Sequence, residues 1–105
     1  MQIRQLSLKE LYDAYEMVQH LYDISYDEFE DLIYEMKDNY TMIGIFEKET
    51  IFAYAGLSIL TTLKDKRHIR VYEIYAKEQK YKQELQNYIE DYAKISAAKK
   101  VVYEN

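Results

Sequence analysis

The first part of the chain carries its apolar residues at the spacing of helices. Between residues 8 and 22 they recur every three or four positions, at Leu8, Leu11, Tyr12, Tyr15, Val18 and Tyr22. This period places them on one face and predicts a single amphipathic helix. The same spacing returns at Phe29, Leu32, Ile33 and Met36, which predicts a second helix.

A capping box precedes each of these helices. In the first, the Ser7 hydroxyl accepts the Glu10 amide, and the Glu10 carboxylate accepts the Ser7 amide in return. Ser25 and Glu28 repeat the pattern. Both helices are therefore predicted to begin directly after a serine, and each start has a matching hydrophobic staple, Leu6 with Leu11 and Ile24 with Phe29.

Downstream of these helices the pattern changes to that of strands. Residues 41–46 and 51–60 are β-branched and aromatic runs joined by a polar turn at 47–50, which predicts a hairpin. A charged loop at 63–67 leads to residues 68–75, HIRVYEIY, a further strand. Strict alternation predicts one face with Ile69, Val71, Glu73 and Tyr75, and another with His68, Arg70, Tyr72 and Ile74.

The last part returns to helical spacing and ends in a short strand. Its apolar stripe consists of Tyr81, Leu85, Tyr88, Ile89 and Tyr92, and residues 101–103 then predict a strand. With a β-compatible segment at 1–6, the order is β-α-α-β-β-β-α-β. We expect a single domain over residues 1–105, an α/β fold of the α+β kind with a mixed sheet.

The composition is that of a globular domain. With 49% hydrophobic and 31% charged residues, the chain is expected to fold around a core. It has no Cys, which fits the reducing cytoplasm. No apolar stretch is long enough to span a bilayer, and the N-terminus lacks the features of a secretion leader. We therefore expect a cytoplasmic protein with no membrane partner.

The net charge of −5 is unevenly distributed. Residues 1–50 carry 12 acids and 4 bases, whereas residues 51–105 carry 7 acids and 10 bases. An acidic chain gains little from neutralising phosphates, so we expect no nucleic acid partner. The basic half could receive a small anion, or the oppositely charged halves of two copies could associate.

No metal site and no nucleophile triad is predicted. The acids of the second helix have no histidine at ligand spacing and fit a solvated face better than a cation site. His20 and His68 are isolated from one another and from other ligand types. No serine stands in a Gly-x-Ser-x-Gly setting.

Three phrases, taken in order, resemble the GNAT-type (Gcn-related) N-acetyltransferases. TMIGIFEKETIFAYAGLSIL looks like their second and third strands, including the small pair Ala55-Gly56. HIRVYEIYAKEQKY looks like the fourth strand and its exit. YIEDYAKISAAKKVVYEN resembles the helix end and fifth strand, with Ala97 where the family has Gly. The resemblance implies a GNAT-like fold and acetyl transfer from acetyl-CoA to an amine.

The β-to-α junction departs from that family. Its members exit the fourth strand through an Arg/Gln-x-x-Gly-x-Gly/Ala turn whose amides hold the coenzyme A pyrophosphate. One alignment places Tyr81 and Lys82 just before this turn, with several loop residues missing. An ungapped alignment from the helix end instead places Lys80 and Lys82 at the glycine positions. In both the glycines are absent, and side chains there hinder the approach of a diphosphate.

Length is the second departure. The family domain continues past the fifth strand into a helix and a strand pair that help to close the acceptor site, whereas this sequence ends at Asn105. A substrate wall would then come from a partner subunit or would not exist. The last strand is also expected to be an open edge that invites pairing.

The resemblance assigns candidate roles to a few residues. Glu73 would be the general base, although its residue type and position favour a structural carboxylate paired with Arg70 or a lysine. The main chain at Ile74, Tyr75 and Ala76 would pair with the pantetheine arm. If coenzyme A binds, its phosphates would meet Lys80, Lys82 and Gln83, with Lys77 nearby, and otherwise these are exposed residues at a helix start.

The leading hypothesis is a shortened GNAT-like protein that is impaired or inactive in acetyl-CoA binding, uses no cofactor, and acts through protein–protein association, as a homodimer or with another partner. The alternative is a minimal acetyl-CoA-dependent N-acetyltransferase that dimerisation completes, with a small amine as acceptor. A third possibility is a piece of a longer acetyltransferase.

Overall fold

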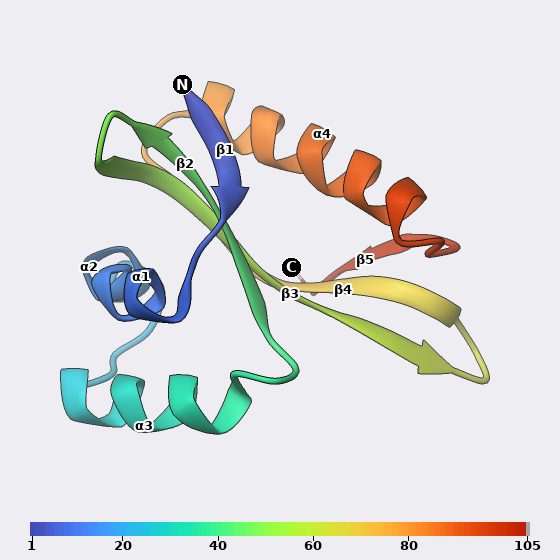
Figure 1. Ribbon diagram of the computed structural model, residues 1–105, viewed down its shortest axis with the longest axis horizontal. Coiled ribbons are helices and arrows are strands. Elements are labelled where there is room, and N and C mark those ends of the chain that lie inside the picture. Colours follow the sequence, from blue (N-terminus) through green and yellow to red (C-terminus); the bar gives the residue numbers. More distant parts are fainter. Residues whose placement is uncertain (105) are drawn as a thin grey trace.

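The chain folds into a five-stranded sheet with helices on both faces (Figure 1). The computed structural model describes residues 1–104. Within that range, no helix is both long enough and apolar enough to cross a membrane. In chain order the elements are β1 (Gln2–Gln5), α1 (Leu8–Asp13), α2 (Tyr15–Val18), α3 (Tyr26–Met36), β2 (Thr41–Glu47), β3 (Thr50–Thr62), β4 (Lys66–Ala76), α4 (Gln79–Ile95) and β5 (Val101–Tyr103).

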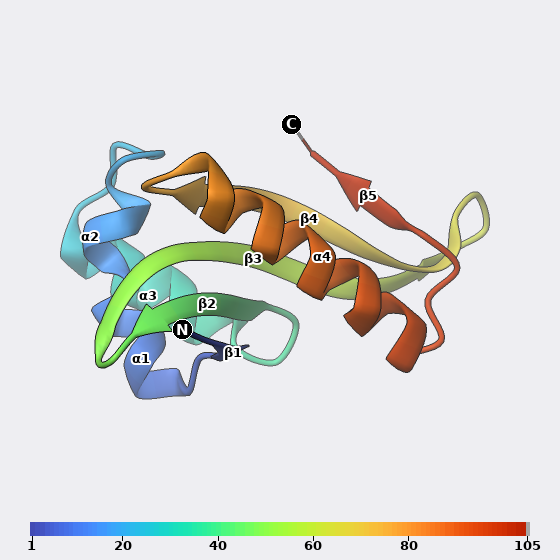
Figure 2. The same cartoon turned by 90° about the horizontal axis from the view of Figure 1, so that it is seen from above.

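The sheet is mixed, as the sequence predicts. Its strand order is β1-β2-β3-β4-β5, antiparallel from β1 to β4 and parallel between β4 and β5. Helix α4 makes the crossover that a parallel pair requires (Figure 2). The predicted hairpin forms between β2 and β3, and its turn holds Lys48 at a φ of 58°. The α+β fold class is therefore confirmed.

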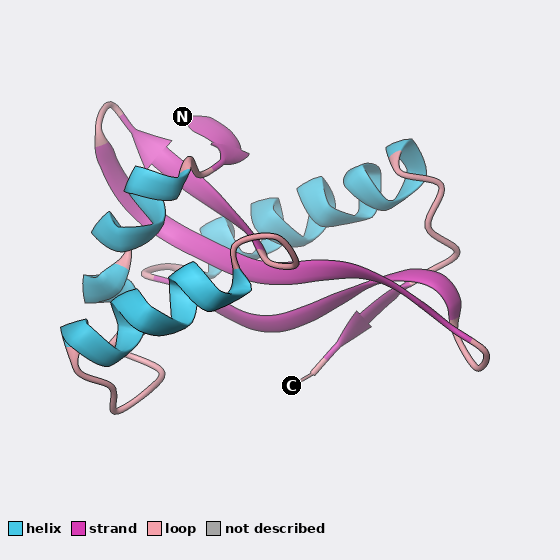
Figure 3. Ribbon diagram, turned by 60° about the horizontal axis from the view of Figure 1, so that its bottom comes forward, coloured by secondary structure: helices cyan, strands magenta, loops and turns pink. Residues whose placement is uncertain are grey.

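Two apolar clusters lie on opposite faces of the sheet (Figure 3). The three-helix cluster lies under α1, α2 and α3, and its buried members include Leu11, Val18, Phe29, Ile33, Tyr40, Met42 and Tyr54. The α4 cluster lies under the long helix, and its buried members include Ile45, Leu57, Ile69, Val71, Tyr81, Leu85 and Ile89. The predicted stripe of α4 thus faces the sheet in full. The stripes of the first two predicted helices do so only in part, because Leu8, Tyr22, Leu32 and Met36 are exposed.

The first predicted helix is wrong in its continuity. Instead of one helix over residues 8–22, α1 ends at Asp13 and α2 spans Tyr15–Val18. Ala14 separates them with a ψ of −2°, and its amide reaches the carbonyls of Glu10 and Leu11. The buried packing of Ala14 and Val18 against the sheet outweighs local helix propensity in so short a segment.

The first capping box is complete and is tied to the sheet. Ser7 and Glu10 exchange both predicted hydrogen bonds, at 2.9 and 3.3 Å. Arg4 of β1 also donates to both carboxylate oxygens of Glu10, at 2.7 and 2.6 Å. The Arg4 bonds, followed by those from Ser7, lower the pKa of Glu10 to about 2. At the second box, the Ser25 hydroxyl accepts the Glu28 amide at 3.2 Å.

The pairing of β3 with β4 shifts by one residue in the middle of β4. Gly56 is paired with Glu73, but the following residue, Leu57, is paired with Val71. Tyr72 is therefore the extra residue of a β-bulge. The strict alternation predicted for this strand is wrong at this point, because a bulge changes which residues share a face.

This β4 bulge decides where the side chains point. Val71 and Ile74 pack on the α4 side, whereas Tyr72 packs against the three-helix cluster. Glu73 contacts Tyr40, a member of the three-helix cluster. Two consecutive residues, Tyr72 and Glu73, thus point to the same side of the sheet.

Helix α4 ends in a turn that normally favours glycine. Ala97 has a φ of 61°, a left-handed conformation in which a Cβ is strained. The amides of Ala97 and Ala98 donate to the carbonyls of Lys94 and Ala93, at 3.3 and 2.8 Å, which is the Schellman pattern. The alanine at the position where the resembling family has glycine therefore occupies a glycine-type conformation.

Candidate functional site

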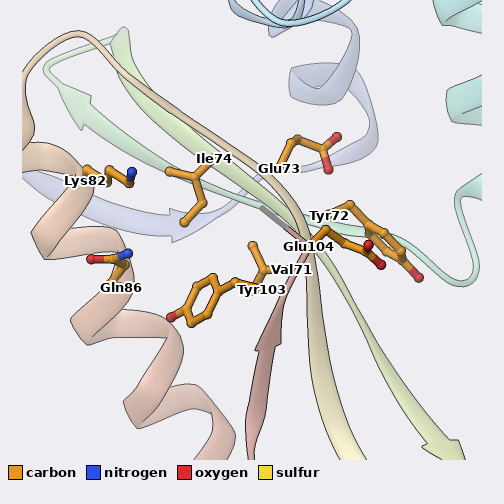
Figure 4. Close-up of a pocket in the computed structure, with 8 residues that line it drawn as sticks. All are labelled: Val71, Tyr72, Glu73, Ile74, Lys82, Gln86, Tyr103 and Glu104. Carbon is orange, nitrogen blue, oxygen red and sulfur yellow. The ribbon is translucent and has the colours of Figure 1, made fainter.

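A cavity lies where β4 and β5 separate (Figure 4). In the described part of the chain, residues 69–71 pair with residues 101–103, and the last backbone bond in this direction runs from the Glu104 amide to the Val71 carbonyl. Beyond this point β4 runs on to Ala76 without β5 beside it. The cavity has a volume of about 240 Å³ and is lined by Val71, Tyr72, Glu73, Ile74, Lys82, Gln86, Tyr103 and Glu104.

The shape of this opening suits an extended chain that carries amides. A strand edge without a neighbour leaves main-chain donors and acceptors free to pair with such a chain. In Figure 4, Ile74 and Tyr103 point toward Lys82 and Gln86 of α4, whereas Glu73 points away from that helix. Of the residues expected to bind a cofactor, the structure brings Ile74 and Lys82 into this cavity.

The other expected cofactor residues have side chains elsewhere. Tyr75 faces the three-helix side, where its ring stacks on His20 with 4.7 Å between centroids. Ala76 packs in the α4 cluster. Lys80 is exposed beside Glu78, and Gln83 donates to Asn87 on the surface of the helix. A main-chain role for Ile74, Tyr75 and Ala76 stays a prediction.

The junction between β4 and α4 is short. Only Lys77 and Glu78 separate the two elements, and Tyr81 and Lys82 are already helical. Both alignments of this junction with the family stay predictions. Tyr81 is buried against Phe52, with 5.7 Å between ring centroids. Among residues 1–104, the backbone has a positive φ at Lys48, Lys66 and Ala97, and none of these lies in the junction.

Among the described residues, Glu73 does not form the ion pair with Arg70 or a lysine that a purely structural role predicts. Arg70 pairs with Glu104, at 2.8 Å between Nη1 and Oε1, and with Asp65. Glu73 instead accepts a hydrogen bond of 2.8 Å from the Tyr40 hydroxyl. Its second oxygen, Oε2, is buried without a partner in the described part of the chain. The predicted pairing with Arg70 or a lysine is wrong.

The surroundings of Glu73 change the acidity of several groups. Burial raises the pKa of Glu73, and the bond from Tyr40 opposes this only in part. Burial, followed by the nearby Glu73 carboxylate, raises the pKa of both Tyr40 and Tyr54. The Tyr54 hydroxyl is buried without a partner among the described residues. A glutamate with a raised pKa accepts a proton near neutral pH more readily than an exposed one.

Gly56 gives Tyr40 the space to reach Glu73. A Cβ built on Gly56 would overlap the Tyr40 hydroxyl oxygen and would lie 2.6 Å from the adjoining ring carbon. The tyrosine ring therefore lies directly on the strand opposite Glu73. Sequence reasoning missed Tyr40, although the small pair Ala55-Gly56 is a signal that a large side chain packs on this strand.

A second cavity lies on the three-helix side of the sheet. Its volume is about 360 Å³, and it is lined by Tyr22, Glu35, Met36, Asn39, Tyr40, Ser58, Tyr72 and Glu73. Glu73 and Tyr72 border both cavities because the β4 bulge lies between them. This aromatic and acidic lining was not predicted, since its members come from four segments that are distant in the sequence.

Metal binding finds no support in the part of the chain that the structure describes, where no cluster of three or more ligand-type side chains occurs. His68 is buried, and its Nδ1 lies 2.9 Å from the Lys66 carbonyl oxygen.

Comparison with known proteins agrees on the fold. Neither a protein-family profile nor a curated protein matches the sequence. Among solved structures, a GNAT family acetyltransferase from Staphylococcus aureus superposes with a TM-score of 0.84 at 12% identity, over 99% of this chain and 85% of that one. A ribosomal-protein-alanine N-acetyltransferase from Brucella melitensis gives a TM-score of 0.79 at 15% identity, over 97% and 77%.

A third similar structure was solved with a cofactor. The aminoglycoside N-acetyltransferase AAC(6')-Iy in complex with CoA gives a TM-score of 0.82 at 11% identity, over 99% of this chain and 76% of that one. At such identities the likeness establishes a shared fold and leaves the activity open. The chain thus has the GNAT acetyltransferase fold, as the sequence predicts.

Proposed function

We propose that this protein is impaired in acetyl-CoA binding and acts by associating with a partner, in the first instance a second copy of itself. The observation that carries the proposal is the short junction between β4 and α4. Only Lys77 and Glu78 connect the strand to the helix, and the ungapped alignment with the family puts Lys80 and Lys82 at its glycine positions. The residues present do not fit a diphosphate held by backbone amides.

Few amides at the start of α4 are available to a ligand. Those of Tyr81 and Lys82 already donate to the Glu78 carbonyl, at 3.1 and 3.4 Å, so the first-turn donors left are those of Gln79 and Lys80. The Lys80 side chain is exposed near Glu78, with 4.0 Å between Nζ and Oε2. A flexible, strongly hydrated ammonium group holds phosphate less specifically than an amide-lined bend does.

Association is supported by the sheet edge and by α3. Strand β5 lies at the edge of the described sheet, so its outer backbone edge is able to pair with another strand. Helix α3 exposes Leu32, Tyr34 and Met36 by 40%, 65% and 37%. Two copies therefore have a strand edge and an apolar surface that they could share.

One observation favours a second candidate, a minimal acetyl-CoA-dependent N-acetyltransferase. Glu73 borders both cavities and has a raised pKa because of its burial. In such a reaction Glu73 takes a proton from an amine in the three-helix cavity. Acetyl-CoA at the β4–β5 opening would supply the acetyl group to the amine nitrogen, and CoA would leave as the thiol after its sulfur takes up the second amine proton. Glu35 and the tyrosines of that cavity suit a small cationic amine.

A titration with CoA separates the two candidates because they predict different variants to be stabilised by CoA. The thermal midpoint is followed with CoA at millimolar concentration for the wild type, for Lys80→Gly with Lys82→Gly, and for Lys80→Glu with Lys82→Glu. If the missing glycines prevent binding, CoA leaves the wild type unchanged and stabilises the glycine variant. If the lysines hold the phosphates, CoA stabilises the wild type, by about 2.7 kcal/mol at ~100 times its Kd, and neither variant.

Lys94→Gly is the matched control. It lies in the last turn of α4, far from the junction, and carries the helix cost of one such substitution, about 1 kcal/mol against about 2 for the double variant. The association is tested separately by light scattering over a range of concentrations. A strict monomer at high concentration would remove the homodimer from the proposal, whatever the CoA result.

A further inference from the structure

One end of the molecule concentrates its positive charge. The turn between β3 and β4, the C-terminal end of α4 and the segment that leads into β5 lie together at one end of the long axis (Figures 1 and 2). We call residues 61–68 and 94–100 the basic tip. It carries six bases and one acid, a net charge of +5 in a chain of net charge −5, so the remaining residues carry −10.

Direct contacts make the basic tip a single surface. Arg67 Nε donates to the Ser96 carbonyl at 2.8 Å, and the Lys99 amide donates to the Arg67 carbonyl at 2.6 Å. The only acid, Asp65, is paired with Lys100 at 2.5 Å between Nζ and Oδ1. Among the described residues, no salt bridge involves the other five bases of the tip, Lys64, Lys66, Arg67, Lys94 and Lys99.

The basic tip also carries the two most exposed large hydrophobic side chains. Leu63, in the turn between β3 and β4, is 96% exposed, and Ile95, at the end of α4, is 84% exposed. Each is flanked by a lysine, Lys64 and Lys94. An exposed aliphatic side chain beside cationic side chains is the arrangement that anchors proteins at the boundary between lipid headgroups and acyl chains.

We propose that the basic tip docks on a membrane surface rich in anionic lipid headgroups. The lysines meet the headgroup charges while Leu63 and Ile95 enter the interface. The acidic residues on α1, α2 and α3, at the other end of the molecule, do not oppose this docking. The molecule is 35 Å long, and charges are screened over about 8 Å at physiological salt. The expectation of no membrane partner rested on the lack of a spanning stretch, which surface docking does not need.

The shape and composition of the basic tip favour a lipid surface over other partners. A stable protein interface buries about 800 Å² on each side, and a narrow turn at the end of a hairpin presents little flat area for it. Nucleic acid binding without base pairing uses aromatic side chains as stacking platforms. Residues 61–68 and 94–100 contain no Tyr or Phe, although the chain has 13 Tyr.

Vesicle binding with two charge-reversal variants tests the proposal. The full chain is sedimented with vesicles of phosphatidylcholine alone or with 30 mol% phosphatidylglycerol, at low and at high salt. Low salt here means an ionic strength of about 0.15 M, at which the distant acidic residues are screened, and high salt means about 1 M. We expect binding to the anionic vesicles at the lower salt only. Lys64→Glu with Lys99→Glu should weaken it by about tenfold or more, whereas Lys9→Glu with Lys37→Glu, on α1 and next to α3, changes the net charge equally and should not.

A tryptophan probe reports on insertion independently of charge. The chain contains no Trp, so Leu63→Trp emits from the basic tip alone, and its emission should shift to the blue with anionic vesicles. The emission of Leu8→Trp, which lies on α1 and away from the basic tip, should not shift. If circular dichroism shows that the charge-reversed tip is unfolded, the tryptophan pair decides the test.

Several outcomes would overturn the proposal. They are no binding to anionic vesicles at low salt, equal binding to both vesicle types, equal loss in both charge-reversal variants, and no emission shift of Leu63→Trp. Binding of an oligonucleotide or salt-sensitive self-association through the basic tip, without vesicle binding, would overturn it in favour of those partners. None of these results depends on whether CoA binds.

Discussion

The two faces of the sheet bury different kinds of side chain. On the α4 side, a single helix of 17 residues covers strands whose fully buried side chains are aliphatic. On the three-helix side, short helices cover a region that buries Tyr40 and Tyr54 beside the half-buried Glu73, and there the Tyr54 hydroxyl and Glu73 Oε2 have no partner among the described residues. The comparison separates a face that stabilises the fold from a face that keeps polar groups out of water.

The polar face carries an energetic cost that the α4 face does not. A buried polar atom without a hydrogen bond costs about 1–3 kcal/mol, and more when it is charged. Local violations of good packing of this kind are concentrated at functional sites in natural proteins. The comparison therefore directs attention to the three-helix face for activity and to the α4 face for stability, and substitutions on each face should behave differently.

The largest expected effect is on the α4 face. Leu85 is fully buried, so Leu85→Ala should lower the free energy of unfolding by about 2–5 kcal/mol through lost burial and a cavity. Leu32→Ala, on the half-exposed side of α3, is the control and should cost less than about 1 kcal/mol. Urea unfolding measures both. Equal losses would mean that the two faces do not differ in packing.

Gly56→Ala should have a smaller effect, confined to the polar face. The new Cβ would overlap the Tyr40 hydroxyl group, so the ring must move and its bond to Glu73 breaks, at a cost of about 1–3 kcal/mol. Gly44→Ala is the control, because the nearest atom to its Cβ is the flexible end of Leu6. If thermal unfolding shows the same change for both alanines, Tyr40 is not held as described.

Glu73→Gln should stabilise the protein in a way that depends on pH. Burial raises the pKa of Glu73 above its ordinary value of about 4.5, so the folded chain binds this proton more tightly than the unfolded chain does. Wild-type stability therefore falls as the pH rises from about 4.5 through the raised pKa. The variant lacks this loss, and its advantage at pH 7–8 should be of the order of 1 kcal/mol.

Thermal midpoints across pH 4–8 measure this difference. Glu10 has the opposite behaviour, because its pKa is lowered to about 2: its contribution is present above about 4.5 and is lost as the pH falls toward 2. Since both proteins keep Glu10, its effect cancels in the comparison. An advantage of the variant that is constant across this range would contradict a buried, ionisable Glu73.

The features that could be predicted from sequence are those set by short-range chemistry. The period of α4, the hairpin of β2 and β3, and the serine caps each follow from residues a few positions apart. The helix break at Ala14 could not be predicted, because it arises from packing against the sheet. Residues 8–22 have the same apolar period whether the helix is broken or continuous.

The candidate site was only partly predictable for a similar reason. Glu73 follows from the resemblance to a known family, but its partner Tyr40 is distant in the chain and meets it only through the register of β3 and β4. The bulge at Tyr72 has no clear signature in the residues around it. Its effect on which face Glu73 occupies could be learned only from the pairing of the two strands.

The β4 bulge also determines which changes of chain length this strand can accept. Loss of the single codon for Tyr72 would make Val71 and Glu73 neighbours on opposite sides of the sheet, each still opposite its present partner on β3. If the codon for Ile69 were lost instead, a regular strand would form only if Val71 and Tyr72 each turned to the opposite side of the sheet. Tyr72 would then lie beneath α4. Position 72 is therefore where a one-residue gap could arise during evolution without moving the carboxylate.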